Sequence, residues 1–110
     1  MTDDSTPLAA HDAPLRTEVR HDEARNRYTL WIDEDAVGLV DYVVTPHEVR
    51  FTHTEVDPRR RHQGLAGILI EHVLDDWRAN SSLTVVPQCP FVERWIDDHT
   101  EYQDLLTRGR

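Results

Sequence analysis

A change of hydrophobic period near the middle of the chain constrains the fold more than any other feature. In residues 27–33 apolar and polar side chains alternate, which predicts a strand with one buried face. In residues 64–79 the apolar side chains recur at three- and four-residue intervals, which predicts an amphipathic helix. A helix with one apolar stripe must bury that stripe against another layer. The sequence therefore predicts a sheet formed mainly by the first half of the chain, and a helix that packs on it.

Four strands are expected before this helix, and one strand and a second helix after it. Short polar turns link the first four strands, as is typical of an antiparallel meander. Pro87 ends the last apolar run, and Pro90 marks the start of the second helix. The predicted fold class is α/β, with a mixed, mostly antiparallel sheet and packed helices. The expected strands are residues 16–22, 27–33, 36–45, 48–57 and 83–86, and the expected apolar stripe of the first helix is Leu65, Ile68, Leu69, Val73 and Trp77.

Length and composition fit one globular domain. The chain has 110 residues, which we divide into a disordered N-terminal tail, 1–15, and a single domain, 16–110. Its 12 basic residues are all Arg and stand against 21 acidic ones; the net charge of −9 argues against general nucleic-acid binding. The one basic cluster, 59–62, fits either a small anionic ligand or a solvated loop.

Targeting and metal-binding signals are not evident in the sequence. No apolar run approaches the ~20 residues that cross a membrane, and residues 1–14 lack the basic and apolar regions of a secretory signal. We therefore expect a cytoplasmic protein without a membrane partner. Cys89 alone cannot form an internal disulfide, and the histidines show no metal-binding spacing, so no metal is expected. Exposed sheet edges are compatible with a monomer or a weak dimer.

The segment between the fourth strand and the first helix carries the strongest functional signal. Residues 61–67 have the sequence Arg-His-Gln-Gly-Leu-Ala-Gly. Small residues let a ligand approach the backbone, and the first N–H groups of a helix attract an anion. Nearby Arg side chains can add charge-assisted hydrogen bonds. No Gly-Lys-Ser/Thr follows and Gly-x-Gly-x-x-Gly is missing, so the segment is neither a P-loop nor a dinucleotide-binding loop.

Arg61, Gly64 and Ala66, at the start of a helix that follows a strand, resemble the pyrophosphate-binding loop of the GCN5-related N-acetyltransferases. Residues 53–56, 86–92 and 99–102 extend the resemblance to a compact subfamily of small acetyltransferase-like domains. The resemblance implies a minimal version of that fold, without the helices that larger relatives carry between the first two strands. It also implies acetyl-CoA or CoA in a V between the fourth and fifth strands. The implied cofactor-binding residues are Val56, Arg61, His62, Gln63, Gly64, Leu65, Ala66, Gly67 and Phe91, with Arg59 and Arg60 as candidates for the 3′-phosphate.

Three residues are candidates for catalysis of acyl transfer to an amine: His53, Glu55 and Cys89. This reaction needs a base, and it benefits from an acid for the leaving thiolate. His53 and Glu55 are two apart, so they share one face of a regular strand unless a bulge intervenes. Cys89 follows the strand implied to border the thioester, and it could accept the acyl group, protonate departing CoA or be structural. His53 and Glu55 could equally be ordinary hydrogen-bonded or solvated strand residues.

Three functions follow from these residues and the resemblance. The first is an acetyl-CoA-dependent N-acetyltransferase that acts on an amine through a ternary complex. The alternatives are a non-catalytic CoA or acyl-CoA binding module and an interaction domain that retains the fold. Many relatives carry a Tyr acid in the helix after the fifth strand, but the aromatic residue there is Trp95; we interpret it and Tyr102 as packing residues. The short link 23–26 predicts an open acceptor groove, suited to a protein side chain or a polyamine.

Overall fold

The computed structural model describes residues 16–60 and 63–109. Five strands form one sheet in the order β1-β2-β3-β4-β5, antiparallel except for the parallel pair β4–β5. The predicted fold class and element order are confirmed. The strands are β1 (Thr17–Asp22), β2 (Arg27–Ile32), β3 (Asp35–Val44), β4 (Glu48–Val56) and β5 (Thr84–Val86); the helices are α2 (Leu65–Asn80) and α3 (Pro90–Asp98), with 3₁₀ turns η1 (Glu23–Arg25), η2 (Pro58–Arg60) and η3 (Thr100–Leu106).

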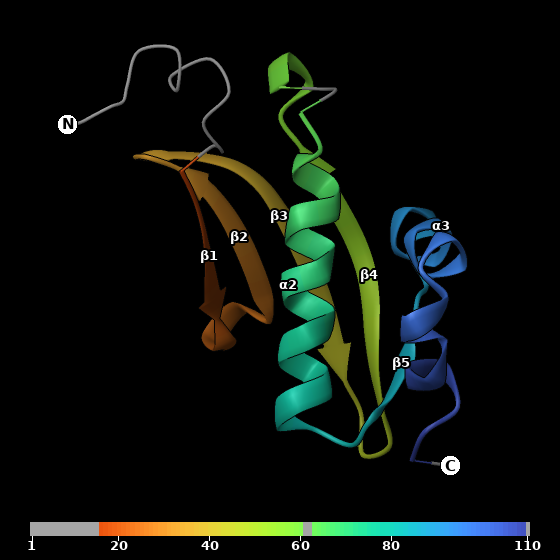
Figure 1. The fold of residues 1–110 in the computed structure, drawn as a ribbon. Coiled ribbons are helices and arrows are strands. Elements are labelled where there is room, and N and C mark those ends of the chain that lie inside the picture. Colours follow the sequence, from red (N-terminus) through yellow and green to blue (C-terminus); the bar gives the residue numbers. More distant parts are fainter. Residues whose placement is uncertain (1–15, 61–62, 110) are drawn as a thin grey trace, which may run out of the picture.

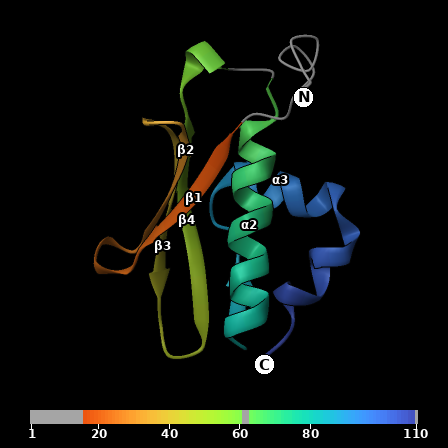
Figure 2. The same ribbon diagram turned by 60° about the vertical axis from the view of Figure 1, so that its left-hand side comes forward.

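Both helices lie on the same face of the sheet. In Figure 1, α2 runs along the sheet and α3 lies beside β5. Figure 2 shows β2, β3 and β4 on one side of the molecule and the two helices on the other. Within the described residues the opposite face of the sheet carries no helix. We call that side the open face.

The helix α2 fixes the core through one apolar stripe. The stripe differs from the prediction at Ile68, which is 39% exposed, whereas Ile70 and Leu74 are buried. The buried side consists of two adjacent i, i+4 rows, one from Leu65 to Val73 and one from Ile70 to Leu74, and Ile68 lies beside them. Each fully buried aliphatic side chain stabilises the fold by roughly 1.5–3 kcal/mol. The buried residues of α2 are Leu65, Leu69, Ile70, Val73 and Leu74.

The link between β1 and β2 is too short for a helical excursion. It consists of η1 and Asn26, which adopts a left-handed conformation with φ of 54°. The Asp22 side chain accepts a hydrogen bond from Arg25 N at 3.3 Å and caps the turn. The predicted minimal version of the fold, without helices at this point, is confirmed.

A β-bulge at Thr52 decides which way the second half of β4 faces. His53 pairs with Asp41 of β3, and Phe51 pairs with Tyr42, so Thr52 is the extra residue. Phe51 therefore faces the helices, and His53, two residues later, faces the open side. The bulge precedes both His53 and Glu55, so these two side chains still share a face.

The parallel pairing of β4 with β5 is short. It joins Glu48, Val49 and Arg50 to the three residues of β5 and then stops. The last backbone contact at the junction is the hydrogen bond from Cys89 N to Phe51 O, at 2.8 Å. A bulge bends its strand, and this bulge lies directly beyond the junction. β4 therefore continues beyond the end of β5, which pairs with it over all three of its residues.

The three tyrosines of the chain predict an alkaline limit to stability. Burial raises the pKa of Tyr28 and of Tyr42, and the hydrogen bond from Tyr102 to Asp75 raises the pKa of Tyr102 to about 12. The folded protein therefore retains phenolic protons that the unfolded chain loses near pH ~10. The free energy of unfolding should fall as the pH rises above ~10. Tyrosinate absorbance should develop at higher pH in the folded protein than in denaturant; coincident titrations would contradict this.

Candidate active site

The inner edge of β4 presents backbone groups to the gap between β4 and β5. Asp57 N donates to Val37 O at 2.8 Å, so this pair is hydrogen-bonded across the β3–β4 ladder. In an antiparallel ladder such pairs alternate with pairs whose backbone groups point outward. Thr54 and Val56 occupy the outward positions. Their N–H and C=O groups are therefore directed into the gap, where a ligand with amide groups could pair with them.

The N-terminus of α2 offers uncapped backbone donors. Gly64 precedes the helix with φ of 72°, and no side chain of the described residues caps the helix. The first helical hydrogen bond runs from Ile68 N to Gly64 O at 3.2 Å, so the N–H groups of Leu65, Ala66 and Gly67 precede it. A Cβ placed on Gly64 would meet nothing within 4 Å. Open space and aligned donors make this end of α2 suitable for an anion.

A groove of about 660 Å³ connects the β4 edge with the N-terminus of α2. Phe91, the second residue of α3, lies at its rim and is 53% exposed. Gln63 lines a neighbouring pocket of about 730 Å³, together with Asp35 and Asp57. Two further predicted cofactor residues, Arg61 and His62, lie outside the described residues. The predicted cofactor residues that the structure brings together in the groove are Val56, Gly64, Leu65, Ala66, Gly67 and Phe91.

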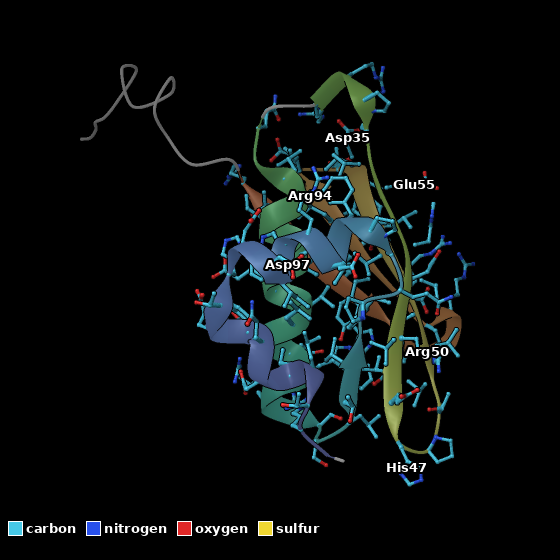
Figure 3. The ribbon with its side chains drawn as sticks, turned by 90° about the vertical axis from the view of Figure 1, so that its right-hand side faces the viewer. Asp35, His47, Arg50, Glu55, Arg94 and Asp97 are labelled. Carbon is cyan, nitrogen blue, oxygen red and sulfur yellow. The ribbon has the colours of Figure 1, made fainter. Side chains whose placement is uncertain are left out.

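Of the two candidates for the 3′-phosphate, Arg60 lines the groove and Arg59 does not. Arg59 hydrogen-bonds to Asp57, an interaction that lowers the pKa of the Asp57 carboxyl. Arg60 has a guanidinium nitrogen 3.6 Å from Asp35 Oδ2, and Figure 3 shows Asp35 near the turn that carries Arg60. Asp35, which lies in the β2–β3 hairpin, thus forms an ion pair with Arg60 of the groove. This pairing joins two loops, and no local sequence signal indicates it.

The three candidate catalytic residues fall into two groups on opposite sides of β4. Cys89 is 7% exposed, and its thiol lies 3.5 Å from Thr54 Oγ1 on the helix side. His53 Nε2 lies 2.6 Å from Glu55 Oε2 on the open face. Figure 3 shows Glu55 projecting from β4 away from the helices. The structure therefore brings His53 to Glu55 and Cys89 to Thr54, but not all three together.

Thr54 is a site residue that the sequence reasoning missed. In an unbulged strand it would face the open side, away from Cys89. The bulge reverses this placement, and Thr54 lies opposite the buried Val40. A bulge at a threonine has no dependable sequence signal, so only the residue pairing reveals this contact.

Among residues 16–60 and 63–109, no three His, Cys, Asp or Glu side chains gather closely enough to hold a metal ion. In the same part of the chain no helix has both the length and the apolar character to cross a bilayer.

The structure is an α/β fold with a groove between the C-terminal half of β4 and the N-terminus of α2. A family model described as GCN5-related N-acetyl-transferase matches residues 27–105, which include the sheet from β2 onward, the groove and α3. The chain belongs to this family of acetyltransferases. A comparison with curated proteins finds no match.

Proposed function

We propose that the chain is an acetyl-CoA-dependent N-acetyltransferase that transfers the acetyl group directly to an amine within a ternary complex. The observation that carries this proposal is the groove that runs from the uncapped N-terminus of α2 along β4 to Thr54, whose hydroxyl lies 3.5 Å from Cys89 Sγ. Membership of the acetyltransferase family supports the same reaction class.

The groove residues fit the chemistry of CoA. The N–H groups of Leu65 to Gly67 suit a pyrophosphate, because they are aligned donors at a helix N-terminus. The Arg60 guanidinium, which lines the same groove, suits the 3′-phosphate. The outward backbone groups of Thr54 and Val56 suit the amides of pantetheine. The space over Gly64, which a larger side chain would enter, leaves the helix end accessible. When bound, acetyl-CoA would supply an acetyl group activated as a thioester.

Cys89 and Thr54 would serve the leaving group. The buried Cys89 thiol can donate its proton to the departing thiolate as the carbon–sulfur bond breaks. The proton released by the attacking amine then restores the thiol. Thr54 Oγ1, 3.5 Å from Cys89 Sγ, would orient it. These two proton transfers complete the reaction without a covalent acyl-cysteine intermediate.

The acceptor amine would approach from the open face. His53 and Glu55 form a hydrogen-bonded pair there, and either could take a proton from an ammonium. No helix of the described residues covers this face, so an exposed amine on a protein or a polyamine can reach it. The net charge of −9 would also attract a cationic acceptor.

A non-catalytic CoA-binding module is the second candidate. The observation that favours it is the placement of His53 and Glu55 on the face of β4 opposite Cys89. Calorimetric titration with acetyl-CoA and CoA, followed by turnover with a panel of amines, separates the candidates. Binding with turnover supports the enzyme, and binding without turnover of any amine supports the module. A folded protein that binds neither ligand would contradict both.

Removing the Cys89 thiol should slow the chemical step without weakening cofactor binding. Loss of a general acid costs about 10²-fold in kcat or more. We therefore expect Cys89→Ala to lower kcat about 100-fold while the Kd for CoA stays within about twofold. Thr54→Val should show the same pattern with a smaller loss. Unchanged turnover in Cys89→Ala would remove this residue from the mechanism.

A further inference from the structure

The indole of Trp95 lies against the first turn of α2. A Cβ placed on Gly67 would be 3.4 Å from Trp95 Nε1 and 4.0 Å from Cδ1, so the N–H edge of the indole faces this turn. Gly67 also lines the groove, and so does Phe91, one helical turn before Trp95 on α3. The indole nitrogen thus lies against Gly67, a residue that lines the groove and that is among the uncapped donors of α2.

Packing on α3 and η3 fixes the plane of this indole. Trp95 stacks on His99 with ring centroids 3.8 Å apart and an interplanar angle of 9°. A ring nitrogen of His99 lies 2.7 Å from Trp95 O, and the Tyr102 ring meets the indole edge-on at 4.9 Å. The indole is therefore a preorganised group.

The indole N–H of Trp95 makes no hydrogen bond within the described part of the chain. No hydrogen bond from Trp95 Nε1 occurs among residues 16–60 and 63–109, whereas Trp31 Nε1 donates to Thr29 Oγ1 at 2.9 Å. An indole nitrogen can only donate, so its natural partner is an acceptor such as a phosphate oxygen. A Cβ on Gly67 would be in van der Waals contact with the indole edge, whereas glycine leaves that space free beside Nε1.

We infer that Trp95 donates its indole N–H to the pyrophosphate of bound CoA, and so is a further cofactor-binding residue rather than a packing residue alone. This inference rests on the proposed function. The indole would complement the N–H groups of Leu65, Ala66 and Gly67, with α3 as well as α2 then contributing a donor to the diphosphate. Trp95, which stands where many relatives carry a Tyr acid, would then serve cofactor binding and not proton transfer.

The experiment is a titration of the three indole N–H resonances of the chain, which belong to Trp31, Trp77 and Trp95. The probes are inorganic pyrophosphate, CoA and pantetheine, which lacks the pyrophosphate. We expect the Trp95 resonance to move downfield with pyrophosphate and CoA but not with pantetheine, while the Trp31 resonance stays in place. This measurement uses the wild-type protein and is independent of the folding of any variant.

Trp95→Phe, which retains an aromatic ring but has no N–H, assigns the resonance and measures the effect on affinity. Loss of one hydrogen bond to a charged group should weaken CoA binding about tenfold and leave pantetheine binding unchanged. If the wild type binds CoA but its Trp95 resonance does not move, the inference is wrong and the proposed function stands. If the wild type does not bind CoA, both are wrong.

Discussion

Replacing Gly64 by glutamate is expected to abolish measurable binding of acetyl-CoA. The new carboxylate would enter the open space at the N-terminus of α2, where the pyrophosphate is proposed to bind. Juxtaposed like charges cost several kcal/mol, which weakens binding by more than about 100-fold. Because the φ of Gly64 is 72°, the side chain also strains the backbone. Calorimetric titration with acetyl-CoA measures the loss directly.

The matched control is Gly64→Gln, which has nearly the same size and backbone strain as the glutamate variant but no charge. We expect it to bind acetyl-CoA more weakly than the wild type and more tightly than Gly64→Glu. Circular dichroism of all three proteins shows whether the fold is retained. Tight binding by a folded Gly64→Glu protein would show that the pyrophosphate does not occupy this helix end.

Replacing Phe51 by alanine should cause the largest loss of stability among single changes on β4. Phe51 is fully buried and meets Tyr42 and Trp77 edge-on, with ring centroids 6.3 Å and 6.5 Å away. Truncation of such a ring leaves a cavity and costs about 3–5 kcal/mol. Since the backbone of Phe51 also holds Cys89, the strand junction should loosen. Urea unfolding gives the free energy change.

Val43→Ala is the matched control, because Val43 is on the neighbouring strand but 46% exposed. A surface truncation of this kind changes the free energy of unfolding by about 0.5 kcal/mol or less. Equal losses in Phe51→Ala and Val43→Ala would mean that the described core does not hold the sheet and α2 together.

The order of elements was predictable because each element has a clear local pattern. Alternation in 27–33 and the stripe in 64–79 predicted β2 and α2, and the two prolines around Cys89 predicted the end of β5 and the start of α3. The groove at Gly64 was predictable for the same reason, since a glycine before an apolar helix is a local signal.

Features set by contacts between distant segments were not predictable. The side of β4 on which Thr54 lies depends on a bulge against β3, and the partner of Arg60 comes from a separate hairpin. Ile68 matched the helical period yet is exposed, because position relative to the sheet decides burial and periodicity alone does not. Sequence patterns specify elements, whereas register and loop pairing specify which side chains meet.

The extra residue at Thr52 has a consequence for how the chain tolerates deletion. Removing Thr52 would leave the alternation of β4 intact, with Phe51 still facing the helices and His53 still facing outward. It would also remove the local bend of β4 and change the direction in which the strand continues beyond β5. One surplus residue in β4 thus sets the course of the strand that forms one side of the groove.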